Sequence, residues 1–492
     1  MLTVLACASP HEEVEENVEP IGTILPLPAG QIVWRSWSAR DSASVLERPM
    51  LLFLYTERSF WCREMVRQCF ENADLAREIN RGTFPIRIDA DMRPDLVERF
   101  GMGGFPSTVF LTPQGDWITG GTYLDPEDLQ RLLRRVRIYF DIPERREDLE
   151  RERQILAKRL AKKNRHPSAI VPSLALFKQR LDSTVVVLKK GVWPGEEAVM
   201  MVLESGDSAA RVLALKVLDR LMESRLRDSD GTFFLAPLSD DWEVLNREKH
   251  LAHNAGLLSL FCLTARQTEH VVYRDVARTL GNALVDRFYV SKDTLFAAGW
   301  PDFETRSRDG AYYAGWNAMA VSGLVSLYGI TKEARYLDIA RLVLESLKRR
   351  MGHPGGGIRH SPGFQGPLFL EDQALVARAA LDLYAVSEQE EHLQLARDLA
   401  DGIQQQFGLD SGAFQDRYPE PGSPVSPVID RFLPSGNGVA VQVMIRLPMQ
   451  DPLAVGRILT SLLRGPLDRS AFAGALNRGL GLYLNHKKAG TP

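Results

Sequence analysis

The period of apolar and polar positions changes along this chain and divides it into two regions. Between residues 32 and 142, short apolar runs alternate with helical patterns, which predicts a compact α/β domain. The predicted strands span residues 49–55, 84–89 and 107–111, with a hairpin turn at 113–116 before a further strand, and the predicted helices span residues 62–80, 94–100 and 126–139.

From about residue 195 the pattern is helical and repeats. An Ala-Arg pair recurs at Ala277, Ala340 and Ala396, which are 63 and 56 residues apart, and each pair follows a helix that ends in a short turn. The repeating unit is therefore a helical hairpin. We expect the hairpins of residues 195–485 to close into an all-α toroid with an inner and an outer ring of helices.

Polar residues open the first helix of each predicted hairpin, and small apolar residues follow them. These openings contain Asn254, Trp316–Asn317, Asp372 and Asn437. Equivalent positions in a closed ring face the same end of it, so we expect these side chains to line one cavity together with Glu248.

The first domain contains one segment with the pattern of a redox site. An apolar run from Leu51 ends at Trp61–Cys62, where a helical pattern begins, and a cysteine at a helix N-terminus has a lowered pKa. A dithiol centre needs a second cysteine at position 59, where Ser59 stands. Cys62 is then either a lone reactive thiol or a packed core residue, and Cys69, two helical turns on, is expected to be core.

Composition excludes several classes of protein. The chain has 492 residues, 45% of them hydrophobic and 25% charged, with a net charge of −3, which indicates two or three globular domains and no basic surface for nucleic acid. No apolar stretch reaches the roughly 20 residues of a membrane helix. Four scattered cysteines give neither a disulfide framework nor a zinc motif. We expect no cofactor and no metal.

Two segments flank the predicted domains differently. Residues 1–31 form an acidic tail, disordered or lipid-anchored, in which Val4–Cys7 is similar to a lipoprotein cleavage box without its preceding basic and apolar regions. Cys7 is therefore either a lipid anchor in the cell envelope or a chance cysteine of a cytoplasmic protein. Residues 143–194 are strongly charged at first and predict a solvated helical linker.

With these motifs, the chain resembles a family that joins a thioredoxin-like domain to an (α/α)6 six-hairpin toroid of the glycosidase-like type. The family includes bacterial thioredoxin-domain proteins and spermatogenesis-associated relatives. The matching motifs are Trp61–Cys62, Asp89, Arg93–Asp95, Gly104–Pro106, Gly120–Tyr123, Pro126–Asp128, Asp241–Trp242, Glu248–Lys249, Asn254, Trp316–Asn317, Asp372 and Pro434–Asn437. The chain is shorter than usual for the family, so the toroid could be abbreviated.

The resemblance also implies functional residues. The family motif is Cys-His-Trp-Cys, so Ser59 and Phe60 argue against a dithiol reductase, and Pro106 is expected to follow a cis peptide bond that faces Cys62. His253 replaces a family aspartate, and Gln373 replaces an aromatic residue.

The toroid mouth has the residue types of a sugar pocket, which needs carboxylates for proton transfer and indole faces for stacking. The candidate carboxylates are Glu248 and Asp372, the candidate stacking residues are Trp242 and Trp316, and the other candidate ligand-binding residues are His250, His253, Asn254, Asn317 and Asn437. Helix capping and hydrogen bonding between helices are the alternative role of these residues, and a metal on the two histidines is a further one.

Two hypotheses of function follow. The first is a binding or redox-linked protein with a degenerate Ser-x-x-Cys site and a protein thiol as partner. The second is a carbohydrate-active enzyme, an epimerase or glycoside hydrolase, with a sugar or polar small molecule in the toroid. Neither involves nucleic acid, and a membrane is involved only through a lipid on Cys7.

Overall fold

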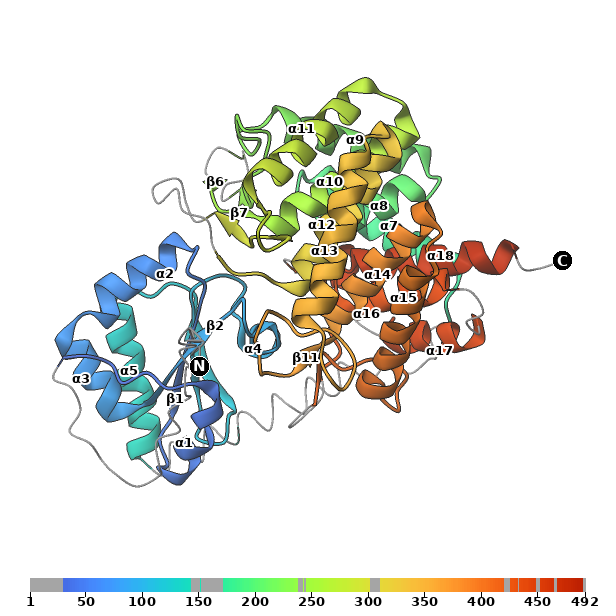
Figure 1. Ribbon diagram of the computed structural model, residues 1–492. Coiled ribbons are helices and arrows are strands. Elements are labelled where there is room, and N and C mark those ends of the chain that lie inside the picture. The colour runs from blue at the N-terminus through green and yellow to red at the C-terminus, as the bar shows by residue number, and fades with distance from the viewer. Residues whose placement is uncertain are drawn as a thin grey trace, which may run out of the picture.

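The computed structural model describes residues 30–142, 151, 171–237, 242, 245–300, 310–419, 425–431, 433–447, 452–463 and 467–489. An α/β domain and a larger helical domain lie side by side (Figure 1). The predictions for Cys7 and for most of the charged segment fall outside the described residues. No helix in the described ranges is both long and apolar enough to cross a bilayer.

The α/β domain is built on one four-stranded sheet with the order β2-β1-β3-β4. Strand β1 (Met50–Tyr55) runs parallel to β2 (Phe84–Asp89) and antiparallel to β3 (Ser107–Leu111), which pairs with β4 (Trp117–Gly121). Alternate residues of β1 enter two different cores, with Leu51 and Phe53 on one face and Leu52 on the other. This is the arrangement expected for a thioredoxin-like fold.

Helices cover both faces of the sheet. The helices of this domain are α1 (Asp41–Val45), α2 (Phe60–Met65), a π-helical turn at Val66–Phe70, α3 (Ala73–Gly82), α4 (Pro94–Phe100) and α5 (Pro126–Asp141). The single helix predicted over 62–80 is wrong, because the chain breaks after Glu71 and starts a new helix. Asn72 caps that helix by accepting hydrogen bonds from the backbone N–H groups of Asp74 and Leu75.

The helical domain is a closed double ring. The inner helices are α8 (Glu196–Glu204), α10 (Leu251–Thr268), α12 (Ala314–Thr331), α14 (Leu370–Ser387), α16 (Gly436–Arg446) and α18 (Gly474–Ala489). Each packs against the next, and α18 packs against α8. The outer helices are α7 (Leu174–Lys189), α9 (Ser208–Glu223), α11 (Val271–Arg287), α13 (Ala334–Met351), α15 (Glu390–Gly402) and α17 (Pro452–Leu462). Every inner helix therefore has an outer partner, and the described hairpins are not abbreviated.

The ring begins earlier than the sequence predicts. Helix α7 lies inside the predicted linker 143–194, yet Phe177, Leu181 and Leu188 are buried in the core of the helical domain. Ser173 caps this helix by accepting a hydrogen bond from the Leu176 N–H. The assignment of residues 174–189 to the charged helical linker is therefore wrong, because apolar side chains on α7 complete the outer ring.

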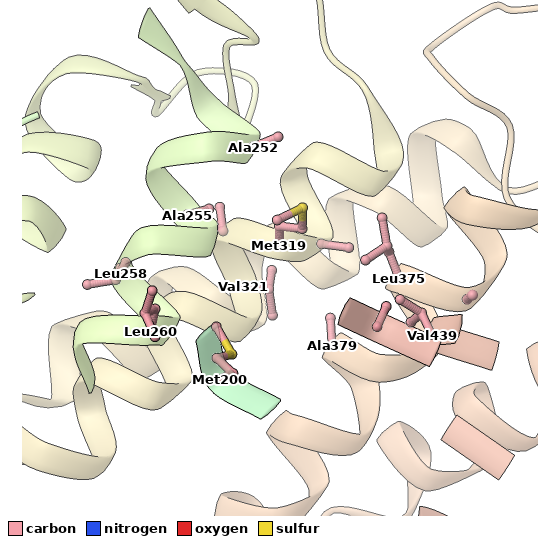
Figure 2. Packing of buried hydrophobic residues seen from close by; sticks show 14 of the residues in the cluster. Met200, Ala252, Ala255, Leu258, Leu260, Met319, Val321, Leu375, Ala379 and Val439 are labelled. Carbon is pink, nitrogen blue, oxygen red and sulfur yellow. The ribbon is translucent and has the colours of Figure 1, made fainter. Parts of the chain in front are cut away.

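Small and apolar side chains fill the space between the inner helices (Figure 2). Ala255 of α10, Ala379 of α14 and Val439 of α16 are fully buried. Small side chains let helix axes approach closely, and apolar burial stabilises the ring by roughly 25 cal/mol per Å². The repeat is also visible at the helix ends, since α10, α12 and α14 all stop at a left-handed residue, namely Glu269, Lys332 and Glu388.

One buried carboxylate connects four inner helices. Glu197 of α8 forms an ion pair with Arg378 of α14 across the ring. Arg478 of α18 lies 3.2 Å from its other oxygen, and Gln442 of α16 donates to that oxygen at 3.3 Å. The arginines hold the pKa of Glu197 at about 2 against the opposing effect of burial. Ion pairs of Glu197, as well as apolar packing, therefore connect the inner helices at the centre of the toroid.

Candidate ligand-binding site between the two domains

The α/β domain covers the mouth of the toroid, and a cavity of about 690 Å³ lies between them. From the α/β domain it is lined by Thr56, Ser59, Phe60, Trp61, Asp91, Gly103, Gly104 and Phe105. The toroid contributes segment 193–197, Leu235, Ala236, segment 245–248, His250, His253, Trp316, Asp430, Arg431, Leu433, Pro434 and Phe472. The Ser59–Cys62 segment and the toroid mouth thus face one another.

Three predicted residues meet on the toroid side of the cavity. Glu248 Oε2 lies 3.0 Å from His250 Nε2, and the His250 ring stacks on Trp316 with a centroid distance of 5.5 Å. Burial raises the pKa of Glu248, but its hydrogen bond with His250 and the charge of Arg58 outweigh this effect, so the net pKa is lowered. Glu248 is therefore an ionised, oriented acceptor in the cavity wall.

A second carboxylate–imidazole pair lines the same cavity. His253 Nδ1 lies 2.7 Å from Glu196 Oε1, which joins α10 to the first turn of α8. Asp430 adds a carboxyl group whose pKa burial raises to about 7, although it accepts hydrogen bonds from the Ser435 and Ala475 N–H groups. The cavity wall therefore contains a carboxyl group, Asp430, that can exchange a proton near neutral pH.

An arginine of the α/β domain reaches into the toroid. Arg58 is buried beside Asp91 at 2.6 Å, and its guanidinium lies 5.1 Å from the centre of the Trp316 ring. Gly299 leaves room for it, because a Cβ there would lie 2.7 Å from the Lys249 carbonyl oxygen and 3.1 Å from Arg58 Cδ. Arg58 therefore contacts Trp316 across the domain boundary, and its charge helps to lower the pKa of Glu248.

Cys62 lies behind the cavity wall and does not line it. Its side chain is buried at the start of α2, and burial raises the pKa of its thiol to about 11. The expectation of a lowered pKa at this helix terminus is therefore wrong, since desolvation outweighs the hydrogen bonds with Thr56 and Ser59 that lower the pKa. Ser59 donates a 3.4 Å hydrogen bond to the Phe105 carbonyl oxygen, and the Phe105–Pro106 peptide bond is cis, as the sequence predicts.

Cys69 is buried, as predicted, and its Sγ donates to the Leu124 carbonyl oxygen. Among the described residues, Cys62, Cys69 and Cys262 are free cysteines. No group of three or more His, Cys, Asp or Glu side chains in the same ranges has the geometry of a metal site.

Asp372 is not a cavity residue, which corrects its assignment as a catalytic candidate. It is fully buried, accepts a 2.8 Å hydrogen bond from the Gly315 N–H, and lies 2.8 Å from His360 Nδ1. His360 Nε2 in turn lies 2.6 Å from the Asp91 carbonyl oxygen of the α/β domain. The charge of Asp372 outweighs burial and raises the pKa of His360 to about 9. Asp372 therefore orients a cationic contact between the domains.

Asn254, Asn317 and Asn437 are also absent from the cavity wall, so their prediction as ligand-binding residues is wrong. Each side chain both accepts from the N–H and donates to the C=O of one loop residue, namely Phe233, Phe296 and Phe414 respectively. Gln373 holds Ile358 in the same way. These amides satisfy buried backbone groups and attach each long loop to an inner helix. The alternative structural role was the right one.

Trp242 lies away from the site as well. Its ring packs under the Arg220 guanidinium of α9, at 4.1 Å, on the outer ring. Its predicted stacking role is therefore wrong. Sequence reasoning missed Arg58, Glu196 and Asp430, although Arg58 directly precedes Ser59 and Glu196 opens the first inner helix.

Ion pairs on α4 hold the two domains together. Asp95, fully buried, pairs with Arg417 of β12 (Arg417–Tyr418) and accepts a 2.8 Å hydrogen bond from Arg93. Arg99 lies 2.6 Å from Asp416, and Glu98 lies 2.9 Å from Arg431. Figure 1 shows α4 facing the toroid. These contacts keep the Ser59–Cys62 segment over the mouth.

Comparison with known proteins agrees with this architecture. Residues 27–161 match the thioredoxin-like DsbH family, described as "Protein of unknown function, DUF255". The match covers the α/β domain and shows its similarity to that family. Human spermatogenesis-associated protein 20 is 26% identical in an alignment of 341 positions that covers 59% of this chain and 42% of the human protein. A Caenorhabditis elegans protein is 35% identical over 112 residues, 21% of this chain and 15% of the worm protein.

This chain therefore spans less than half the length of these relatives. The helical domain of this chain has a fold similar to that of six-hairpin toroids. A crystal structure of D-mannose isomerase superposes with a TM-score of 0.51 and 12% identity, covering 66% of this chain and all of that chain. At 12% identity, this superposition shows that the two proteins share a fold, and it does not show a shared function.

Proposed function

We propose that this protein binds a sugar or similar polyol in the cavity between its two domains and that its Ser-x-x-Cys site is a degenerate, non-reducing wall of that cavity. The observation that carries the proposal is that Ser59, Phe60 and Trp61 face Glu248, His250 and Trp316 across one cavity of about 690 Å³. Such a volume is typical of small-molecule sites, roughly 300–1,000 Å³.

The chemistry of the wall supports a polyol. The carboxyl oxygens of Glu248 and Glu196 can accept hydrogen bonds from hydroxyl groups, His250 and His253 can donate or accept, and Phe60 and Trp61 offer apolar faces. The raised pKa of the Cys62 thiol removes its nucleophilic form at neutral pH. Binding is therefore better supported than a redox-linked role, and a protein thiol partner remains an untested prediction.

A second candidate function is proton transfer on the bound sugar, of the epimerase or hydrolase type. The two carboxylate–imidazole pairs, Glu248–His250 and Glu196–His253, support it because acid–base catalysis needs one group that gives a proton and one that accepts it. The superposable D-mannose isomerase acts on a sugar within the same fold.

Titration calorimetry with glucose, mannose, galactose and N-acetylglucosamine tests the proposal. We expect at least one of them to bind, and Glu248→Gln to weaken that binding at least tenfold while unfolding free energy changes by no more than about 1–2 kcal/mol. Glu269→Gln, an exposed substitution at the other end of α10, is the matched control and should bind normally.

Nuclear magnetic resonance spectra of the incubated sugar separate the two functions. A new sugar species formed by the natural protein and not by Glu248→Gln supports catalysis, and an unchanged sugar supports binding alone. If none of these sugars binds, or if Glu248→Gln binds as well as the natural protein, the proposal is wrong.

A further inference from the structure

The cavity has aromatic side chains in two different environments. Trp316, on the toroid, is 5% exposed and stacks on His250, so it lies at the inner end. Phe60 and Trp61, on the α/β domain, also line the cavity but are 48% and 49% exposed. They therefore lie at the rim, between the cavity and solvent.

The rim aromatics are held in place although they are half exposed. The Phe60 and Trp61 rings meet edge to face at 5.4 Å, and Trp61 meets Tyr123 in the same way at 5.1 Å. Aromatic pairs in this geometry gain about 0.5–1.5 kcal/mol beyond area burial. Two neighbouring apolar rings that a fold leaves exposed and fixed at a cavity opening are typical of a binding surface.

Polar side chains also line the cavity, between its inner end at Trp316 and its rim at Phe60 and Trp61. Glu196, Glu248 and His253 belong to the same cavity wall as Trp316 and the rim aromatics. A volume of about 690 Å³ exceeds what one sugar ring fills and is comparable to that of sites for larger ligands, about 300–1,000 Å³. A ligand that uses the whole cavity must present alternating hydroxyl edges and apolar faces along its length.

We propose that the ligand is an oligosaccharide, with one sugar ring beside the polar groups at Glu248 and an outer ring stacked on Phe60 and Trp61. This inference rests on the proposed sugar-binding function and specifies its substrate class. The rim of the Ser59–Cys62 segment then acts as a second sugar subsite. Stacking on an aromatic face tolerates differences in hydroxyl pattern, so chain length contributes more to affinity here than the identity of the outer sugar.

Titration calorimetry with two matched series tests the subsite: glucose, cellobiose and cellotriose, and mannose with its β-1,4-linked di- and trisaccharide. We expect the trisaccharide of the bound series to have a Kd at least tenfold lower than its monosaccharide. Phe60→Ala and Trp61→Ala should each raise the trisaccharide Kd by a larger factor than the monosaccharide Kd, and so remove most of that gain.

Trp117→Ala is the matched control. Trp117 is a 47% exposed tryptophan on β4 of the same domain that does not line the cavity, so the chain-length gain should survive its removal. Trp61→Phe should retain part of the gain, because phenylalanine keeps an aromatic face for stacking.

The outcomes distinguish this subsite from the function on which it rests. If a monosaccharide binds but longer chains bind no tighter, or if Phe60→Ala weakens all chain lengths equally, the rim subsite is overturned and sugar binding stands. If no member of either series binds, both inferences are overturned together.

Discussion

We expect Glu197→Gln to lower the free energy of unfolding of the toroid by about 3–5 kcal/mol, the range found when one member of a buried ion pair is removed. Glu197 neutralises Arg378 across the ring and also contacts Arg478 and Gln442. Its loss leaves the Arg378 charge in a low-dielectric environment between inner helices, where the cost of desolvation is no longer offset.

Acid should weaken the same interaction. The pKa of Glu197 is about 2 in the folded protein. It is 4.5 for a glutamate without these partners, as in the unfolded chain. A group with a depressed folded pKa stabilises the protein above its unfolded pKa and loses that effect as pH falls towards the folded value. The natural protein should therefore lose this contribution between about pH 4.5 and pH 2, and Glu197→Gln should not.

Guanidinium unfolding of the toroid, measured at pH 7 and between about pH 4.5 and pH 2, gives both the loss of unfolding free energy in Glu197→Gln and its dependence on pH. Glu204→Gln is the matched control, because Glu204 pairs with the same Arg478 but is 29% exposed. Exposed pairs contribute about 0–1 kcal/mol, so this control should change little. Equal small losses in both variants would show that the bridge across the ring does not stabilise the toroid.

We expect Asp95→Asn to loosen the α/β domain from the toroid and to cost about 3–5 kcal/mol. Asp95 is fully buried at the interface, where it neutralises Arg417 and is held by Arg93. These guanidinium groups lower the pKa of Asp95 against the effect of burial, which shows that its charged form is the one stabilised. The substituted amide keeps the shape but removes the charge.

Hydrogen exchange of the backbone of α4 and β12, followed by mass spectrometry, measures this loss. Exchange there should rise strongly in Asp95→Asn, whereas the exposed control Asp74→Asn, which removes a surface pair with Arg77, should match the natural protein. Unchanged protection at α4 in Asp95→Asn would contradict an interface held by this carboxylate.

Much of the fold follows from local pattern. The strands of the first domain and the repeating hairpins are visible because apolar period and turn residues act over short distances. The break at Asn72 was missed because a capping residue inside a continuous helical pattern changes the chain only through its own side-chain hydrogen bonds. The ion pair of Glu197 and Arg378 joins residues 181 positions apart and has no local signal.

The candidate site was harder to predict than the fold. Glu248, His250, His253 and Trp316 were placed correctly in the cavity, but Asn254, Asn317 and Asn437 were not. A polar residue at the start of a buried helix looks the same in sequence whether it faces a ligand or holds a loop. Its recurrence in several hairpins is itself a signal, since every hairpin has a loop to attach while a ligand contacts only some of them.

Restoring a second cysteine by Ser59→Cys tests whether the toroid has made the Ser59–Cys62 segment inaccessible to protein disulfides. Both side chains are buried, with 5% and 2% of their surfaces exposed, and the toroid mouth covers them. Thiol–disulfide exchange needs direct access of one sulfur to another. We therefore predict that insulin reduction by Ser59→Cys stays within about twofold of the background of the natural protein. Turnover comparable to that of a dithiol thioredoxin in the same assay would contradict the claim that the toroid makes this segment inaccessible to protein disulfides.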